Sequence, residues 1–231
     1  MKIIIRLMQS IVIIVGGAAL YLFVVGIIPG ISAPAQPLKR TKTPEPGPDA
    51  VPGRSDVQFY VDGVVVNAWL YLPASRTGPV PCVVMAHGLG GTRDMGLDDY
   101  AQRFRTNGYA VLAFDYRYFG ASGGEPRQLI WIPDQLEDWK AAIAFVRSRP
   151  EIDSSRIALW GTSLSGGHVI VTAAEDHDIA CVVAQCPGVD GRESAEVAFF
   201  AAGVGNSLRL VMHAQRDLVR SWLGLSPHKV P

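Results

Sequence analysis

The spacing of apolar and polar positions along the chain predicts strands that alternate with helices. Runs that are almost wholly apolar, Val80–Ala86, Tyr109–Phe114 and Ile179–Ala184, indicate strands buried on both faces. Elsewhere apolar side chains recur every three or four residues, which is typical of amphipathic helices. The two helical stripes between these strands are Leu97, Tyr100, Ala101 and Phe104, and Leu136, Trp139, Ile143 and Val146. This alternation predicts a parallel sheet with helices on both faces.

Both ends of this pattern carry additional elements. Val57–Val61 and Val64–Leu72 are separated by Asp62 and Gly63, which predicts an antiparallel β-hairpin with a two-residue turn. The expected fold class is therefore α/β, with a mostly parallel sheet and an N-terminal antiparallel hairpin. Near the C-terminus, a helical apolar stripe suits a lid above the sheet; it consists of Leu208, Val211, Met212, Leu218, Val219 and Trp222.

The N-terminus has a different character. An unbroken apolar run from Ile11 to Ile28 follows two basic residues and is just long enough, at ~18 residues, to span a bilayer as a helix. We expect a single-pass membrane anchor in residues 1–30, with secretion after cleavage near Ala33–Ala35 as the alternative. Residues 31–54 are rich in proline and poor in large apolar side chains, which predicts an extended linker. Residues 55–231 then form the catalytic domain.

Composition excludes several classes of function. The chain has 231 residues with 21 basic and 21 acidic side chains, so no net charge attracts it to nucleic acid. The hydrophobic content of 48% is high, and the N-terminal run accounts for much of the excess. We place all three cysteines, Cys82, Cys181 and Cys186, in predicted strands as buried thiols. No phosphate-loop lysine or metal-spaced cluster of histidine and cysteine occurs, so neither a cofactor nor a metal is implied.

The strongest chemical signal is Gly161-Thr162-Ser163-Leu164-Ser165, between the predicted strand Ile157–Trp160 and the apolar segment Val169–Ala174. This is the G-x-S-x-G pattern of a nucleophile elbow, with serine in place of the last glycine. A turn this tight needs small residues, and it pushes the hydroxyl of Ser163 out at the top of a sheet; the residues that make room are Gly161, Ser165, Gly166 and Gly167. The alternative is a glycine- and serine-rich loop with no chemistry.

A second motif, His87-Gly88-Leu89-Gly90-Gly91, follows the strand Val80–Ala86. Glycines here let the backbone turn sharply and present N–H groups to a developing oxyanion. We expect His87 to hold this loop by hydrogen bonding and not to act as the base.

These two motifs, with Phe114-Asp115-Tyr116-Arg117 between them, resemble the α/β-hydrolase family from about Asp56 to the end of the chain. The chain looks like the dienelactone-hydrolase and serine-aminopeptidase branches, and also like fungal polyketide transferases. The resemblance implies Ser163 as the nucleophile, the backbone N–H groups of Leu164 and Leu89 as the oxyanion hole, and a small acyl or ester substrate. It also implies that the loop at Asp115 shapes the pocket and does not supply the triad acid.

The acid and the base are harder to find, because the family order is serine, acid, histidine along the chain. Asp190 is a weak candidate for the acid and His228 a weak candidate for the base. His213 falls in the predicted lid helix, and His168 and His177 follow the serine too closely to fold back over it. Relatives would add two more strands where this chain ends, so we expect a C-terminally truncated hydrolase.

Three interpretations remain open at this point. The first is a serine hydrolase that acts on esters or related acyl substrates through an acyl-enzyme on Ser163. The second is an acyltransferase on the same fold, in which an alcohol replaces water. The third is a truncated, weakly active or non-catalytic fragment, from which we expect poor hydrolysis of simple esters.

Overall fold

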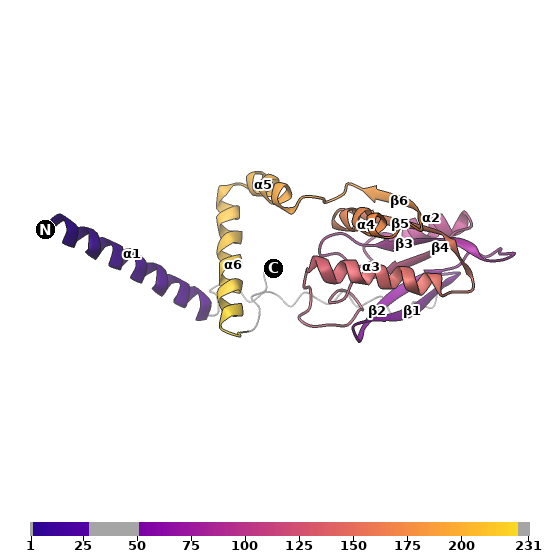
Figure 1. Ribbon diagram of the computed structural model, residues 1–231, viewed down its shortest axis with the longest axis horizontal. Helices are drawn as coiled ribbons and strands as arrows, with labels where there is room; N and C mark the ends of the chain where they lie inside the picture. The colour runs from indigo at the N-terminus through magenta and orange to yellow at the C-terminus, as the bar shows by residue number, and fades with distance from the viewer. Residues whose placement is uncertain (1, 28–50, 226–231) are drawn as a thin grey trace. The chain divides into compact units, whose positions relative to one another are not determined.

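The computed structural model describes residues 2–27 and 51–225 (Figure 1). The chain divides into two compact units. One unit comprises Met1–Lys42 together with Arg192–Pro231, and the other comprises Thr43–Gly191. The three-part division at residues 30 and 54 remains a prediction, and most of the expected linker lies outside the described residues.

The unit formed by Thr43–Gly191 is built on one six-stranded sheet. Its strands are β1 (Arg54–Val61), β2 (Val64–Tyr71), β3 (Val80–Ala86), β4 (Ala110–Phe114), β5 (Ile152–Thr162) and β6 (Ile179–Gln185), in the order β1-β2-β4-β3-β5-β6. The four strands β3 to β6 run parallel, and β1 and β2 are antiparallel to their neighbours. The hairpin turns at Asp62 and Gly63, with φ of 49° and 77°, as a two-residue turn requires. The predicted α/β fold class is confirmed.

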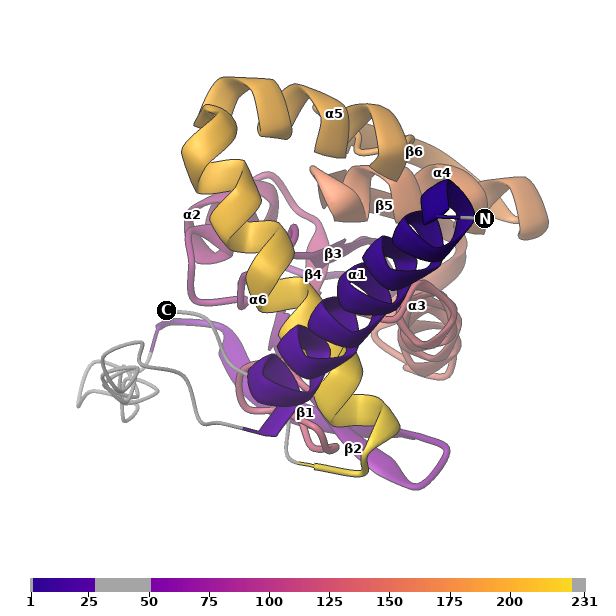
Figure 2. The same ribbon diagram turned by 90° about the vertical axis from the view of Figure 1, so that its left-hand side faces the viewer.

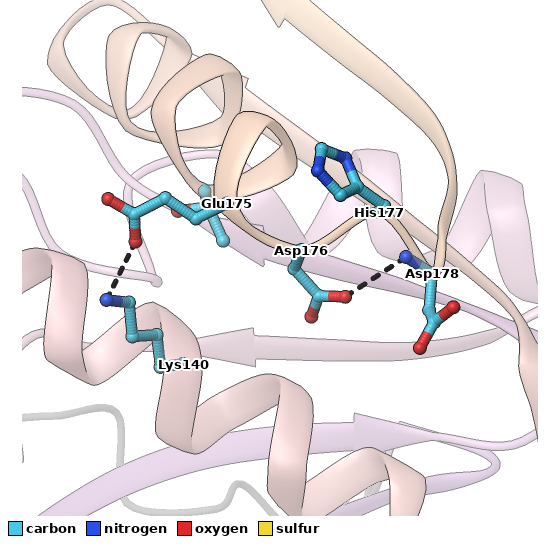
Figure 3. Close-up of a pocket in the computed structure, with 6 residues that line it drawn as sticks. Lys140, Glu175, Asp176, His177 and Asp178 are labelled. Carbon is cyan, nitrogen blue, oxygen red and sulfur yellow. Dashed lines mark hydrogen bonds and ion pairs between the residues drawn. The ribbon is translucent and has the colours of Figure 1, made fainter.

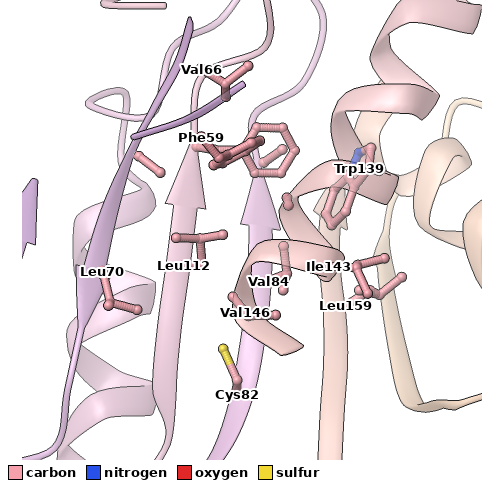
Figure 4. Packing of buried hydrophobic residues seen from close by; sticks show 14 of the residues in the cluster. Phe59, Val66, Leu70, Cys82, Val84, Leu112, Trp139, Ile143, Val146 and Leu159 are labelled. Atoms are coloured by element: carbon pink, nitrogen blue, oxygen red, sulfur yellow. The ribbon is translucent and has the colours of Figure 1, made fainter. Parts of the chain in front are cut away.

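Helices cover both faces of this sheet. They are α2 (Leu97–Thr106), α3 (Ile132–Arg147) and α4 (Leu164–Glu175). Figure 2 shows α2 on one side of the sheet and α3 and α4 on the other. A buried apolar cluster lies under each layer, and the larger one joins Trp139 and Ile143 of α3 to Val84 and Leu159 of the strands (Figure 4). The helical stripes predicted from sequence therefore mark the faces that pack on the sheet.

The other unit contains α1 (Lys2–Ile27), α5 (Gly191–Ala202) and α6 (Val204–Trp222). The apolar stripe near the C-terminus does form a helix, α6, whereas α5 was not expected from the pattern. Many apolar side chains of α6 remain exposed, including Leu208, Met212 and Trp222 at 55%, 50% and 73%. The role of this helix as a lid stays a prediction.

The N-terminal segment requires a correction. α1 contains the predicted apolar run only as far as Ile27, and its first turns carry Arg6 and Gln9. A bilayer core needs roughly 20 consecutive apolar residues in a helix. Within residues 2–27 and 51–225, no helix is both long and apolar enough to cross a membrane. The predicted single-pass anchor is therefore wrong. The membrane partner that it implied has no support in the described residues. The alternative cleavage site, Ala33–Ala35, lies outside the described residues.

The cysteines also require a correction. Cys82 is buried in β3, and this burial raises the pKa of its thiol to about 12. Cys181 and Cys186 are exposed instead of buried. The reason is that β6 is the last strand of the sheet, so part of its surface faces solvent, and Cys186 follows the strand at its end.

Candidate active site

The nucleophile elbow predicted from sequence is a single-residue connection. β5 ends at Thr162 and α4 begins at Leu164, so Ser163 alone makes the turn. Its backbone has φ 55° and ψ −120°, a conformation that residues other than glycine rarely adopt, and its side chain is exposed. The Ser163 N–H donates to the Gln185 carbonyl at 2.9 Å, and the Ser163 carbonyl accepts from the Gly188 N–H at 2.8 Å. Bonds on both sides therefore hold the strained residue in place.

Three glycines make this geometry possible, as expected. A Cβ on Gly161 would lie 2.2 Å from the carbonyl oxygen of Ser165. A Cβ on Gly166 would lie 2.9 Å from Cα of Pro187, and one on Gly167 would lie 2.3 Å from the carbonyl oxygen of Gly188. These separations are shorter than real Cβ contacts, so the loop after β6 packs directly on the first turn of α4. Larger residues at these positions would push the elbow apart.

The fourth small residue, Ser165, plays a different part. Its hydroxyl is completely buried and forms a hydrogen bond with the hydroxyl of Tyr116. The indole N–H of Trp139 donates to the same Tyr116 oxygen at 2.8 Å. Burial raises the pKa of the Tyr116 hydroxyl, which therefore stays protonated. The sequence pattern did not connect Tyr116 or Trp139 to the elbow; the serine at a glycine position was the signal that could have done so.

The loop after β3 lies against the elbow. A Cβ on Gly88 would be 3.1 Å from Cβ and 3.6 Å from Oγ of Ser163, so a larger residue would crowd the serine. Leu89 follows Gly88, and Leu164 is the first residue of α4. The two residues predicted to form the oxyanion hole therefore adjoin the two segments that meet at the serine.

His87 supports this loop from beneath. It is buried, and its Nδ1–H donates to the Gly88 carbonyl at 2.9 Å. Its ring meets the Tyr116 ring edge-on at 4.9 Å between centroids. Burial lowers the pKa of His87, so the imidazole is neutral at pH 7. These contacts agree with the predicted role of holding the loop.

Asp115, at the end of β4, ties two loops together. Its carboxylate accepts the Arg93 N–H at 2.7 Å and the Ala121 N–H at 3.1 Å. Gly120 has φ 50°, and a Cβ there would lie 2.3 Å from the carboxylate. Asp115 is thus occupied by backbone donors and shapes the loop.

Arg117 anchors the other side of this loop to α3. Its Nε–H donates to Asp138 at 2.6 Å, and its backbone N–H donates to the same carboxylate at 2.9 Å. Further bonds reach Asp62 and Glu137, each at 3.0 Å. Burial raises the pKa of Asp138 to about 6, while Arg117 acts in the opposite direction. This buried ion pair holds the segment after β4 against the helix.

The candidate acid and base are less well defined. Asp190 is exposed and lies two residues after Gly188, in the segment that bonds to the Ser163 carbonyl. His228 lies outside the described residues. His213 belongs to α6 in the other unit.

His168 is not available as a base. It is 3% exposed within α4, and its Nε2–H donates to the Gln135 side-chain carbonyl at 2.8 Å. Burial lowers its pKa to about 4, so the ring is neutral at pH 7. As predicted, it points into the core instead of folding back over the serine.

A cleft of about 490 Å³ lies at the other end of α4 (Figure 3). Its lining residues are Lys140, Thr172, Glu175, Asp176, His177 and Asp178. Lys140 pairs with Glu175 at 2.7 Å, and Asp176 pairs with Arg147 at 2.8 Å. Helix rise places this cleft roughly 18 Å from the elbow. In the part of the chain that the structure describes, no cluster of three or more potential ligands could hold a metal ion.

The chain is similar to known proteins along much of its length. The family model for X-Pro dipeptidyl-peptidase (S15 family) matches residues 62–219. The quorum-quenching protein AidA of Acinetobacter baumannii is 51% identical over 176 residues, which is 76% of this chain and 56% of that protein. The polyketide transferase grgF of Penicillium sp. is 35% identical over 144 residues, or 62% of this chain and 48% of that protein.

The chain is also similar to solved structures. The α/β hydrolase GrgF from Penicillium sp. sh18 superposes with a TM-score of 0.62 at 30% identity, covering 77% of this chain and 58% of that one. The esterase Pf2001 of Pyrococcus furiosus gives 0.54 at 25% identity, covering 65% and 59%. The chain spans about half the length of the curated relatives that it matches.

Proposed function

Because the chain belongs to the X-Pro dipeptidyl-peptidase (S15) family of the α/β-hydrolase superfamily, we propose that it is a serine hydrolase acting on carboxylic esters or related acyl substrates. The observation that carries this proposal is the backbone of Ser163, which is strained, exposed and held between β5 and α4. A buried, strained serine would have no chemical use, whereas an exposed one at the top of the sheet can reach a substrate.

In the proposed reaction, the Ser163 hydroxyl oxygen attacks the carbonyl carbon of the substrate and gives its proton to a base. The negative charge that develops on the carbonyl oxygen is stabilised by the N–H groups of Leu164 and Leu89. Collapse of this intermediate breaks the bond to the leaving alcohol, which takes the proton from the base. Water then attacks the acyl-serine by the same steps, releasing a carboxylic acid and restoring Ser163.

We assign the acid to Asp190 and the base to His228 within this proposal. Asp190 is supported by its place after β6, two residues beyond the Gly188 N–H that donates to the Ser163 carbonyl. His228 is supported by the family order of serine, acid and histidine along the chain. Neither buried histidine of the sheet unit competes for the role of base, because His87 and His168 are each only 3% exposed and already hydrogen-bonded to other groups.

An acyltransferase on the same fold is the second candidate. It is favoured by the relatives that are named polyketide transferases, such as grgF of Penicillium sp.. A thiohydrolase of Aspergillus aculeatus, which is 37% identical over 137 residues, favours hydrolysis instead. Both candidates share the acyl-enzyme on Ser163 and differ only in whether water or an alcohol resolves it. Adding methanol to an ester hydrolysis reaction separates them: a transferase forms methyl ester in preference to acid.

The test of the nucleophile uses the full chain and a fluorophosphonate probe, which bonds covalently to an activated serine. We expect labelling of the wild-type protein, complete loss in Ser163→Ala, and no change in Ser154→Ala, which removes an exposed hydroxyl from β5. Turnover of p-nitrophenyl acetate should fall in parallel by at least about 10³-fold in Ser163→Ala. Labelling that survives Ser163→Ala would show that the nucleophile is another residue.

A further inference from the structure

A chain of three buried polar groups lies directly beneath the elbow. Trp139, Tyr116 and Ser165 are each at most 1% exposed. The indole of Trp139 can only donate, so the Tyr116 oxygen accepts from it at 2.8 Å. The Tyr116 hydroxyl also shares a hydrogen bond with the Ser165 hydroxyl, in which either oxygen can be the donor. The bonded groups thus run from α3 through Tyr116 to the first turn of α4.

This chain connects segments that are distant in the sequence. Tyr116 follows β4, and β3 separates β4 from β5 in the sheet. To reach Ser165, the Tyr116 side chain crosses the end of β3, where its ring meets the His87 ring edge-on at 4.9 Å. It therefore contacts both segments that meet at Ser163: the loop after β3 and the first turn of α4.

We propose that Tyr116 and Ser165 are positioning residues, whose hydrogen bond fixes the first turn of α4 against the loop after β3. The bond thereby sets the distance between the N–H groups of Leu164 and Leu89, and it holds Ser163 between them. This role rests on the proposed function of Ser163. A glycine at position 165 would leave the turn without this attachment and would leave the buried Tyr116 hydroxyl without this partner.

The physical reason for the proposal is that oxyanion stabilisation depends steeply on donor position. Hydrogen-bond donors must lie about 2.7–3.1 Å from the place where the charge develops, and small displacements remove their benefit. The elbow is strained, so it relaxes when its support is removed. Loss of one buried hydrogen bond should therefore reduce reactivity at Ser163 without unfolding the domain.

The experiment uses the full chain with Tyr116→Phe, Ser165→Ala, the double variant and a control. The control is Thr172→Val, which removes a buried hydroxyl from the same helix, α4, where that hydroxyl has no hydrogen-bond partner. Three quantities are measured for each protein at a temperature where all are folded. They are the second-order rate constant for fluorophosphonate labelling, the free energy of unfolding in urea, and the exchange rate of the Gly167 amide.

We expect each single variant to label about tenfold more slowly than wild type, because either substitution removes the same hydrogen bond between Tyr116 and Ser165. The double variant should label no more slowly than the slower single variant, and Thr172→Val should match wild type. The Gly167 amide, which donates to the Ser163 carbonyl, should exchange faster in both single variants, while the Val84 amide in β3 should not. The proposal is overturned if the single variants have only a lower free energy of unfolding, while their labelling rate and their Gly167 exchange rate equal those of wild type.

Failure of the proposed function gives a different result. If wild type does not label, or if Ser163→Ala still labels, Ser163 is not the nucleophile, and the amide exchange decides the positioning role by itself. Faster exchange confined to Gly167 in Tyr116→Phe and Ser165→Ala then supports a fixed elbow. Equal exchange in all four variants and wild type refutes it.

Discussion

Replacing a residue with glycine usually lowers the stability of a protein, but the backbone conformation of Ser163 predicts the opposite at this position. Its φ of 55° with ψ of −120° suits glycine and is sparsely populated by other residues. Such conformations cost on the order of 1–3 kcal/mol, and active sites retain them because they serve the chemistry. Replacing Ser163 with glycine should therefore release strain.

The magnitude follows from two opposing contributions. Removing the Cβ releases about 1–3 kcal/mol of strain, because glycine adopts this backbone conformation freely. Glycine makes the unfolded chain more flexible, which opposes folding by about 0.5–1 kcal/mol. We therefore expect Ser163→Gly to be more stable than wild type by roughly 0.5–2 kcal/mol. Ser163→Ala keeps the Cβ and should lie within about 0.5 kcal/mol of wild type.

The assay is urea unfolding of the full chain, with the denaturant slope required to be equal among variants. The matched control is the pair Ser154→Gly and Ser154→Ala in β5, where the backbone does not have a positive φ. There glycine should be less stable than alanine by about 0.5–1 kcal/mol. The same order at position 163, with glycine less stable than alanine, would refute the argument that the elbow is strained.

Three further predictions concern packing and charge. Burial lowers the pKa of His168 to about 4, below its unfolded value of about 6.5. The contribution of the neutral His168 ring to the free energy of unfolding is therefore fully present above pH 6.5, and it is lost as the pH drops toward 4. His168→Gln should flatten this pH dependence of the urea midpoint, and an unchanged slope would contradict it. Asp138→Ala leaves the guanidinium of Arg117 buried without its main partner and should lower the free energy of unfolding by about 3–5 kcal/mol, with the double change to Asp138→Leu and Arg117→Met recovering part of the loss. Gly167→Ala should destabilise by about 1–3 kcal/mol in urea unfolding, because its Cβ would lie 2.3 Å from a carbonyl oxygen, whereas Gly78→Ala has open space and should be near neutral in the same assay.

The sheet could be predicted from sequence because its strands and helices carry strong local patterns. Val80–Ala86 is apolar throughout because β3 lies between two other strands and beneath helices on both faces. The hairpin could be predicted because Asp62 and Gly63 tolerate positive φ. The elbow could be recognised because only small residues fit where β5 meets α4, and each of the three glycines there has a backbone neighbour at close range.

Other features depend on contacts that a local pattern does not contain. The exposure of Cys181 follows from the position of β6 at the edge of the sheet. Because β6 is as apolar as a central strand, its sequence does not indicate that it lies at the edge. The hydrogen bond between Tyr116 and Ser165 spans 49 residues, and the ion pair between Arg117 and Asp138 spans 21. The N-terminal run did form a helix, α1, but among the described residues no helix is long and apolar enough to cross a membrane, so an apolar run of ~18 residues was not sufficient for that prediction.

The elbow also explains why its motif tolerates serine at one glycine position and not at the other. Gly161 and Ser165 touch through backbone, since a Cβ on Gly161 would lie 2.2 Å from the Ser165 carbonyl oxygen. Any side chain at position 161 would therefore enter the turn itself. The side chain at position 165 instead points into the core, where the Tyr116 hydroxyl satisfies its oxygen. Glycine is required at the first position by the close approach of backbone, whereas the last position accommodates serine because its hydroxyl has a buried partner in Tyr116.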